Sequence, residues 1–354
     1  MADTPFIVKL TRILRKTALY IEAQPSQSST SKSNMLRTKT EYLQQTFGTT
    51  DEVQIWHKEE DNIHDAHISG TVKLALPYEA PVHPPLPSVE EIRQAWKTSR
   101  LTQPGGLCSV CRIGPMVVKF STGIRILQEA ENLLYLQEHT KVRAPRLYAA
   151  YKENYPQGED GLVLANFLVM EFIEGMTMTE DYFMDMEKRD QRMLLQRLGE
   201  QLQLLRSVKP PGRAYYEELM LAFYEATEFR LSRWSCDPDY GEDEIKHLED
   251  IKRVLWPSEH REPMLTHFDI KWPNMVVSPI KPSAGGEPGD WKVTLIDWDH
   301  AGWAPAYMQK ASLFQRLPVL EEIRAQETFC GFHRSQYKEE MDVLMFEGFT
   351  LGLL

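Results

Sequence analysis

Short apolar runs near the middle of the chain alternate with turn residues in the way that paired β-strands do. The runs are 108–113, 116–120 and 166–173. Gly114 and Pro115 separate the first two runs, and this pattern predicts a hairpin. Between the second and third runs, Leu127 and Leu134 share one side of a predicted helix over 124–139. We therefore expect a sheet-rich segment over 101–175.

Beyond residue 175 the apolar residues recur at helical spacing. This period predicts helices over 187–207, 215–234 and 241–256. One further run of β-forming residues, Trp291 to Ile296, interrupts the helical half. A sheet-rich half followed by a helix-rich half predicts an α+β, bilobal fold with a small β-rich N-terminal lobe and a larger helical C-terminal lobe.

The first hundred residues carry weaker patterns. We expect a basic amphipathic helix over 1–22, a Ser/Gln-rich linker over 24–34, a short strand over 72–76, a Pro-rich segment over 77–87 and a helix over 88–97. Ser88 and Glu91 are spaced as a capping box at the start of the last helix. None of these segments has an assigned chemical role. We therefore divide the chain into an extension over 1–100, an N-terminal lobe with hinge over 101–175 and a C-terminal lobe over 176–354.

Composition narrows the class of protein. The formal charge of −11 counts against a nucleic-acid-binding protein. No apolar run is long enough to span a bilayer, and the basic N-terminus lacks the apolar core of a secretory signal, so we expect a cytoplasmic protein without a membrane partner. Cys108 and Cys111 lack the second pair that a tetrahedral zinc site needs, and we expect them to pack on a strand and its turn.

The polar residues between 265 and 299 carry the most chemical information. His267, Asp269 and Asn274 are spaced as His-x-Asp-x-x-x-x-Asn, and Asp297 follows the run of β-formers. Phosphoryl transfer from a nucleotide needs one carboxylate to orient the acceptor hydroxyl, and an amide with a second carboxylate to hold Mg²⁺. The interval of five lets one tight loop present Asp269 and Asn274 to the same cluster. The pattern therefore predicts a phosphotransferase.

The run 116–120 contains a lysine where a charge is unexpected. Lys119 stands in the apolar sequence MVVKF, so its ammonium group needs a partner across a cleft. Side chains alternate between the two faces of a strand, so Val117 shares a face with Lys119. We therefore expect Val117 to touch whatever the lysine serves.

Taken in order, these segments resemble the aminoglycoside phosphotransferase-like kinases. The segments are VVK ending at Lys119, QEAEN with Glu129, VMEFIEG at 169–175, HFDIKWPN with Asp269 and Asn274, and IDWD with Asp297 and Asp299. The resemblance covers residues 101–320 and is strongest to the fungal-type branch, in which EAEN, MEFIEG and IDW(E/D)xAGWxP segments recur. It implies a protein-kinase-like fold that binds ATP and Mg²⁺.

The resemblance implies roles for residues of the N-terminal lobe. Lys119 would contact the α- and β-phosphates of ATP and be oriented by Glu129. Glu131 competes with Glu129, which is preferred because the glutamate of the resembled kinases precedes a Leu-Leu pair by four residues. The carbonyl of Glu171 and the amide of Ile173 would pair with the adenine edge at the hinge.

The resemblance also implies roles in the C-terminal lobe. Asp269 would be the catalytic base or hydroxyl-orienting group, and Asn274 and Asp297 the Mg²⁺ ligands, since hard oxygens suit that ion. Lys271 would either steady the transferred phosphate or face solvent. His267 would brace the loop, and Asp299 would either steady the loop or approach a second metal.

Two features depart from the resembled kinases. Phe268 stands where they have glycine, so the loop must hold a bulky side chain. No Gly-x-Gly-x-x-Gly sequence precedes Lys119, and the only candidate for a phosphate loop is Pro104-Gly105-Gly106. These departures bear on nucleotide binding more than on the fold.

Three functions remain open from the sequence. The first is a Mg·ATP-dependent small-molecule kinase that phosphorylates a hydroxyl or an amine, with choline- or ethanolamine-type kinases as an alternative. A cationic acceptor would suit the acidic helical lobe, where the candidate acids are Glu217, Glu218, Asp237, Asp239 and the run 242–244. The others are a kinase-like pseudoenzyme and an interaction protein that works through residues 1–100.

Overall fold

The computed structural model describes residues 38–51, 54, 73–103, 108–157, 161–209, 250, 253–255, 257–280, 290–317 and 328–345. The chain forms two units, Met1–Arg37 and Thr38–Leu354, and all described residues belong to the second. The helix expected over 1–22, the linker over 24–34 and the glycines of the candidate phosphate loop lie outside the described residues. The helices expected over 215–234 and 241–256 also lie outside them, apart from residues 250 and 253–255, which are helical.

The N-terminal lobe is built on a five-stranded sheet in the order β1-β4-β5-β3-β2. Its strands are β1 (Tyr78–Glu79), β2 (Ser109–Ile113), β3 (Met116–Ser121), β4 (Leu147–Gln157) and β5 (Gly161–Glu171). Every pairing in it is antiparallel. The hairpin predicted at Gly114 and Pro115 is confirmed, and Gly114 has φ 57°, a conformation that glycine adopts without strain.

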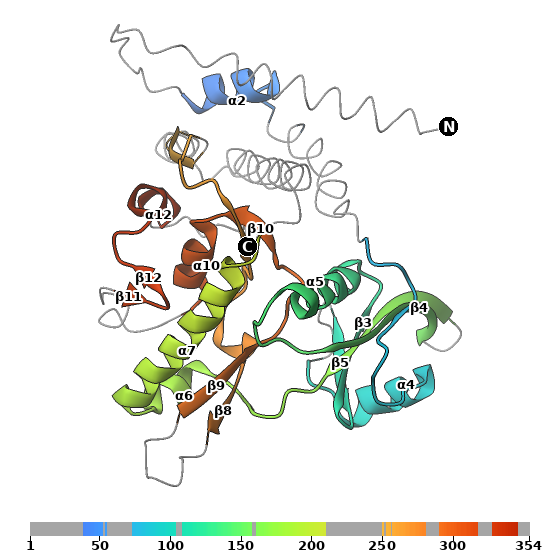
Figure 1. Cartoon of the computed structure of the whole chain (residues 1–354). Coiled ribbons are helices and arrows are strands. Elements are labelled where there is room, and N and C mark those ends of the chain that lie inside the picture. The colour runs from blue at the N-terminus through green and yellow to red at the C-terminus, as the bar shows by residue number, and fades with distance from the viewer. Residues whose placement is uncertain are drawn as a thin grey trace, which may run out of the picture. The chain divides into compact units, whose positions relative to one another are not determined.

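Two helices cover opposite faces of this sheet (Figure 1). On one face, Ile92 of α4 (Val89–Thr98) packs in a cluster with Val118 and Phe120 of β3. On the other face, Leu127 of α5 (Arg125–His139) belongs to the larger core that includes Val117. Because residues of β3 alternate between the two clusters, both faces of the strand are buried. The lysine on β3 therefore lies on the face that α5 covers.

The N-terminal lobe begins earlier than residue 101. Tyr78 and Glu79 of β1 pair with β4, and α4 supplies the cover for one face of the sheet. The capping box predicted for this helix is confirmed, since Ser88 caps α4 and Glu91 bonds back to it. The strand expected over 72–76 is absent from its described residues 73–76, because the free edge of β4 pairs instead with Tyr78 and Glu79.

The C-terminal lobe combines helices with short strands. Its elements are β6 (Met176–Thr177), α6 (Glu180–Asp185), α7 (Lys188–Arg206), β7 (Pro263–Thr266), the 3-10 helix η1 (Trp272–Asn274), β8 (Met275–Ile280), β9 (Asp290–Leu295), β10 (Gly302–Pro305), α10 (Met308–Arg316), β11 (Thr328–Phe329), β12 (Phe332–His333) and α12 (Lys338–Leu344). Helix α2 (Lys39–Phe47) precedes the N-terminal lobe. The predicted α+β bilobal fold is confirmed. Within the described part of the chain, no helix combines the length and the apolar character needed to cross a membrane.

Buried leucines explain why α7 forms where the sequence predicts a helix over 187–207. Its inward side carries leucines three or four residues apart, at 194, 198, 202 and 205, each at most 1% exposed. Helix α7 packs on β7 and β9, each of which leads into one of the two polar loops of this lobe. The leucine face of α7 therefore fixes the strands that carry the candidate site.

Candidate active site

Lys119 of β3 is the centre of a buried ion cluster. Its Nζ donates to both carboxylate oxygens of Glu129 on α5, at 2.9 and 2.8 Å, and to Oδ1 of Asp297 at 2.6 Å. The side chains of Lys119 and Glu129 are only 10% and 1% exposed. One ammonium group therefore joins the sheet, the helix and the segment that follows β9. The bond to Glu129 is expected from the sequence, whereas the bond to Asp297 is not.

The charges in this cluster shift one another's proton affinity. Burial alone would lower the pKa of Lys119, but the two carboxylates outweigh it and raise that pKa, so the lysine stays charged. Burial alone would raise the pKa of Asp297, but the Lys119 ammonium outweighs it and holds the pKa below its usual value. Burial raises the pKa of Glu129, and the nearby charge of Asp297 adds to this effect, so the Lys119 ammonium offsets only part of it. Because two carboxylates share one ammonium group, a further cation beside Asp297 would be stabilised by the cluster.

Glu131, the alternative partner of Lys119, faces elsewhere. Its Oε2 accepts a hydrogen bond of 2.9 Å from the backbone N–H of Lys73. Residues two apart on a helix point in different directions, so Glu129 and Glu131 cannot both reach β3. The structure thus pairs Lys119 with Glu129.

The loop between β7 and β8 gathers three further candidates. Asn274 donates through Nδ2 to the carbonyl and to Oδ2 of Asp269, both at 2.9 Å. The two oxygens of Asp269 are acceptors, so the side-chain nitrogen of Asn274 must face them. The side-chain oxygen of Asn274 therefore points away from Asp269. Lys271 pairs with Oδ2 of Asp269 at 2.6 Å, with its own side chain 40% exposed. The spacing from 269 to 274 does close one tight loop.

A β-hairpin brings this loop to Asp297. Strands β8 and β9 are antiparallel, and Met275 pairs with Leu295 at their open end. The N–H of Ile296 donates to the carbonyl of Asn274 at 3.0 Å, so the residues before β8 and after β9 are bonded directly. Asp297 itself has φ 67°, which turns the chain sharply after the strand. Asn274 and Asp297 therefore flank the same end of one hairpin.

His267 ties the two loops together and does not face a substrate. It is fully buried, and its Nε2 lies 3.0 Å from the carbonyl of Ile296. A carbonyl can only accept, so Nε2 carries the proton and Nδ1 accepts from the Asp269 N–H at 3.4 Å. Burial lowers the pKa of His267, which is therefore neutral near pH 7. These contacts support the bracing role expected from the sequence.

The buried neutral His267 predicts that the protein loses stability in mild acid. The imidazole takes up a proton below about pH 6.5 in the unfolded chain but only at lower pH in the folded one. The unfolded state then binds more protons, so the free energy of unfolding should fall with pH by up to about 1.4 kcal/mol per unit. Urea unfolding between pH 7.5 and 5 measures this slope. His267→Gln keeps a donor for Ile296 and should show a smaller slope, and an equal slope would contradict the prediction.

The hinge residues lie at the exit of β5. The N–H of Glu171 donates to the carbonyl of Arg146 at 2.8 Å. The N–H of Ile173 donates to none of the described residues. Val117 is 8% exposed and lies opposite Arg112 on β2. The guanidinium group of Arg112 stacks on the Phe172 ring, 3.5 Å from its centre. Val117 and the hinge thus face the same side of the sheet as Lys119.

Asn132 is a site residue that sequence reasoning missed. It lies one helical turn after Glu129 on α5, and its Nδ2 donates to the carbonyls of Trp298 and Ala301 at 2.8 and 2.9 Å. The N–H of Trp298 also donates to Glu129 at 3.2 Å. The i, i+3 spacing within EAEN could have identified Asn132, since residues so spaced share a helix face. Helix α5 therefore holds the loop that follows Asp297.

Asp299 pairs with a neighbour on the same loop. Its Oδ1 lies 2.6 Å from Nδ1 of His300, whose Nε2 lies 2.8 Å from Arg125 of α5. These contacts support the first of the two expected roles of Asp299, which is to steady the loop. They add a second link between this loop and α5.

The oxygen atoms at the hairpin end fit a magnesium ion better than a soft metal. Within the described ranges, no three His, Cys, Asp or Glu side chains are grouped as metal ligands. Mg²⁺ instead binds through one or two protein oxygens, water and the phosphates of a substrate. The side-chain oxygen of Asn274 and the carboxylate of Asp297 supply such oxygens.

The two cysteines near β2 are free thiols. Cys108 lies just before the strand and is partly buried, and Cys111 lies on the strand and is fully buried.

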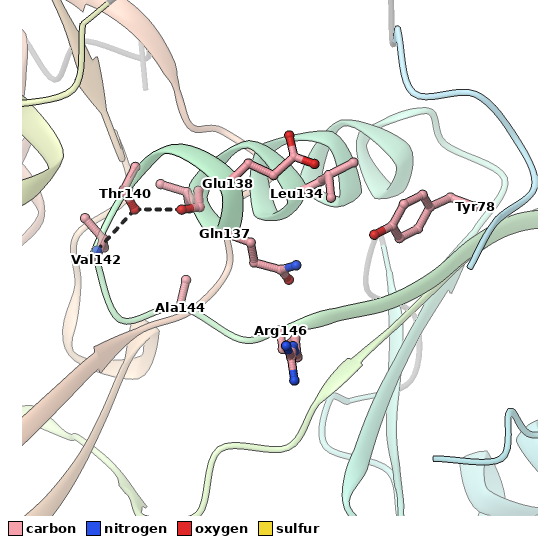
Figure 2. A pocket seen from close by; sticks show the side chains of 9 residues that line it. Tyr78, Leu134, Gln137, Glu138, Thr140, Val142, Ala144 and Arg146 are labelled. Carbon is pink, nitrogen blue, oxygen red and sulfur yellow. Dashed lines mark hydrogen bonds between the residues drawn. The ribbon is translucent and has the colours of Figure 1, made fainter. Parts of the chain in front are cut away.

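A separate cavity of about 420 Å³ lies beside the C-terminal half of α5 (Figure 2). Its lining is Tyr78, Leu134, Leu136, Gln137, Glu138, Thr140, Val142, Ala144 and Arg146. None of the site residues predicted from the sequence borders it. Its charged groups, Glu138 and Arg146, are exposed, and we assign it no ligand.

The chain matches one protein family and is similar to several solved structures. The model of the phosphotransferase enzyme family matches residues 107–338. No curated protein sequence matches the chain. The chain is similar to the streptomycin–ATP ternary complex of APH(2")-IIa, at 15% identity and a TM-score of 0.47, with 74% of this chain and 87% of that chain covered.

Two aminoglycoside phosphotransferases show a similar degree of likeness. The ADP-bound APH(2'')-Ib is 15% identical, with 72% and 85% of the two chains covered and a TM-score of 0.47. APH(3'')-Id from Streptomyces rimosus is 16% identical, with 72% and 86% covered and a TM-score of 0.38. Likeness of this degree does not identify the acceptor.

Proposed function

Since the chain belongs to the phosphotransferase enzyme family, we propose that it transfers the γ-phosphate of Mg·ATP to a hydroxyl or amine of a small molecule. The observation that carries the proposal is the buried Lys119, bonded at once to Glu129 and Asp297. In protein kinases a strand lysine held by a helix glutamate contacts the phosphates of ATP, and Lys119 and Glu129 form such a pair. Asn274 stands beside Asp297 at the same end of the β8–β9 hairpin, and its side chain is bonded to Asp269.

Each residue has one task in this mechanism. Lys119, held by Glu129, binds the α- and β-phosphates, while the hinge at Glu171 and Ile173 and the side chain of Val117 hold the adenine. Asn274 and Asp297 would hold Mg²⁺, which neutralises charge on the phosphates when bound.

The transfer step itself uses Asp269 and Lys271. Asp269 orients the acceptor hydroxyl and takes its proton as the new oxygen–phosphorus bond forms and the bond from the γ-phosphorus to the bridging oxygen breaks, which leaves ADP. Lys271, which pairs with Asp269, steadies the transferred phosphate in this mechanism. Lys119, Glu129, Asp269 and Asn274 are held by buried hydrogen bonds.

The acidic residues that would favour a cationic acceptor, including Glu217 and Asp237, lie outside the described residues. A choline- or ethanolamine-type acceptor therefore remains one arm of the test. A pseudoenzyme is disfavoured because both bonded groups are present: Lys119 with Glu129 and Asp297, and Asn274 with Asp269.

Asp297→Asn tests the metal assignment. The amide is almost the same size, but it is neutral and cannot balance Mg²⁺, so Mg²⁺-dependent turnover should be abolished. The rise in melting temperature that Mg²⁺ adds in the presence of ATP should vanish as well. Asp290→Asn is the matched control, since this carboxylate lies at the start of β9 and pairs with Arg197. A normal metal-dependent shift in Asp297→Asn would place the metal elsewhere.

A further inference from the structure

The residue before the catalytic aspartate adopts a strained backbone conformation. Phe268 has φ 61°, and the N–H of Asp269 donates to the carbonyl of His267 at 2.8 Å. A hydrogen bond across two residues with positive φ at the middle one is the rare form of the γ-turn. It sets the direction in which the Asp269 side chain leaves the loop.

An L-residue holds this turn only if its surroundings impose it. The Cβ atom disfavours positive φ, and such residues persist only where neighbouring groups determine them strongly. For glycine the two mirror-image γ-turns are equal in energy, so a glycine would occupy the required one without help. Phe268 has no such freedom.

Two side chains of α10 supply the constraint. Ser312 donates through Oγ to the carbonyl of Phe268, and Oε1 of Gln309 accepts the N–H of His267 at 2.9 Å. Ser312 and Gln309 are fully buried and lie one turn apart on α10, so they face the loop together. Hydrogen bonds from α10 therefore hold the backbone before and after the strained residue.

We propose that Ser312 and Gln309 of α10 are positioning residues that hold the Phe268 turn and so aim Asp269 at the acceptor. This inference rests on the proposed phosphotransfer for its kinetic consequence alone. Without Ser312 the loop at Phe268 would relax to ordinary negative φ for most of the time. The carboxylate of Asp269 would then point correctly in only a fraction of the molecules.

Ser312→Ala tests the proposal in three backgrounds, with Phe, Ala or Gly at position 268. Removing the hydroxyl should lower kcat for ATP turnover about tenfold with Phe268, which is the size expected for a lost buried hydrogen bond that opposes strain. The same loss is expected in the Phe268→Ala background, because alanine keeps the Cβ atom and lacks only the ring. In the Phe268→Gly background the loss should be about twofold or less. KM for ATP should not change in any of the three.

A second measurement reads the loop without enzymatic activity. Hydrogen exchange of peptides covering 265–275 reports the protection of the Asp269 amide. Ser312→Ala should speed this exchange with Phe or Ala at 268 and leave it nearly unchanged with Gly. Ser258→Ala is the matched control, since Ser258 is a buried serine bonded to Glu340 away from this loop, and its effect should not depend on residue 268.

Three results would overturn the inference. They are an equal effect of Ser312→Ala in all three backgrounds, no effect with Phe268, or an effect on ATP affinity in place of kcat. A wild-type chain that turns over no ATP would contradict the proposed function instead. In that case the order of the exchange rates would still decide whether α10 holds the turn.

Discussion

Asp269→Asn should lower kcat by about 10²–10⁴-fold, the range by which a positioned acid or base contributes to catalysis. The amide preserves the size of the side chain and can still accept from Asn274, so the loop should keep its shape. It cannot take the acceptor's proton. ATP affinity should change far less, because the carboxylate faces Lys271 and Asn274 and not the Lys119 cluster. Single-turnover kinetics beside a nucleotide-binding titration measure the two quantities.

Lys271→Ala is the internal control for this experiment. If the lysine steadies the transferred phosphate, its removal should lower kcat as well, and if its half-exposed ammonium only faces water it should have no effect. Full turnover in Asp269→Asn would mean that the aspartate is not the orienting group.

Lys119→Ala should weaken ATP binding by about tenfold to a hundredfold, since it removes hydrogen bonds to charged phosphates. Turnover should fall at least as much. The variant should also melt at a lower temperature, because Glu129 is left as a buried carboxylate without its cation. Isothermal titration with ATP and Mg²⁺, below the melting temperature of each variant, gives the affinity.

Glu129→Gln separates the lost charge from the lost orientation. It keeps Lys119 and its bond to Asp297, so ATP should still bind, with a smaller loss of affinity. Combining Glu129→Gln with Lys119→Ala removes the unpaired carboxylate and should restore thermal stability without restoring ATP affinity. Unchanged affinity and turnover in Lys119→Ala would exclude the lysine from the nucleotide site.

The sequence predicts well the features that depend on local spacing. The alternation around Lys119 gives the strand and its face, and the capping box at Ser88 gives the start of α4. The five-residue interval from Asp269 to Asn274 predicts a tight loop, and a hydrogen bond between the two side chains closes it. These features need no knowledge of distant residues, so composition and period are sufficient.

Other features depend on contacts between distant segments, which no local pattern encodes. The pairing of β1 with β4 joins Tyr78 to Ala150, and this pairing moves the start of the N-terminal lobe ahead of residue 101. Asn132 and Ser312 bond to loops more than forty residues away, and although the EAEN spacing places Asn132 on the face of Glu129, no local pattern marks Ser312. The sequence did single out Phe268 as unusual, but the positive φ and the residues that hold it appear only in three dimensions.

The central claim is that this chain moves a phosphate from ATP to a small molecule. Its most direct test incubates the full chain with Mg²⁺ and ATP labelled in the γ-phosphate, against a panel of small alcohols, amino alcohols and aminoglycosides. We predict that label appears in at least one acceptor, requires Mg²⁺ and is lost in Asp269→Asn. A chain that binds Mg·ATP but transfers label to no member of the panel above the Asp269→Asn background would contradict the account.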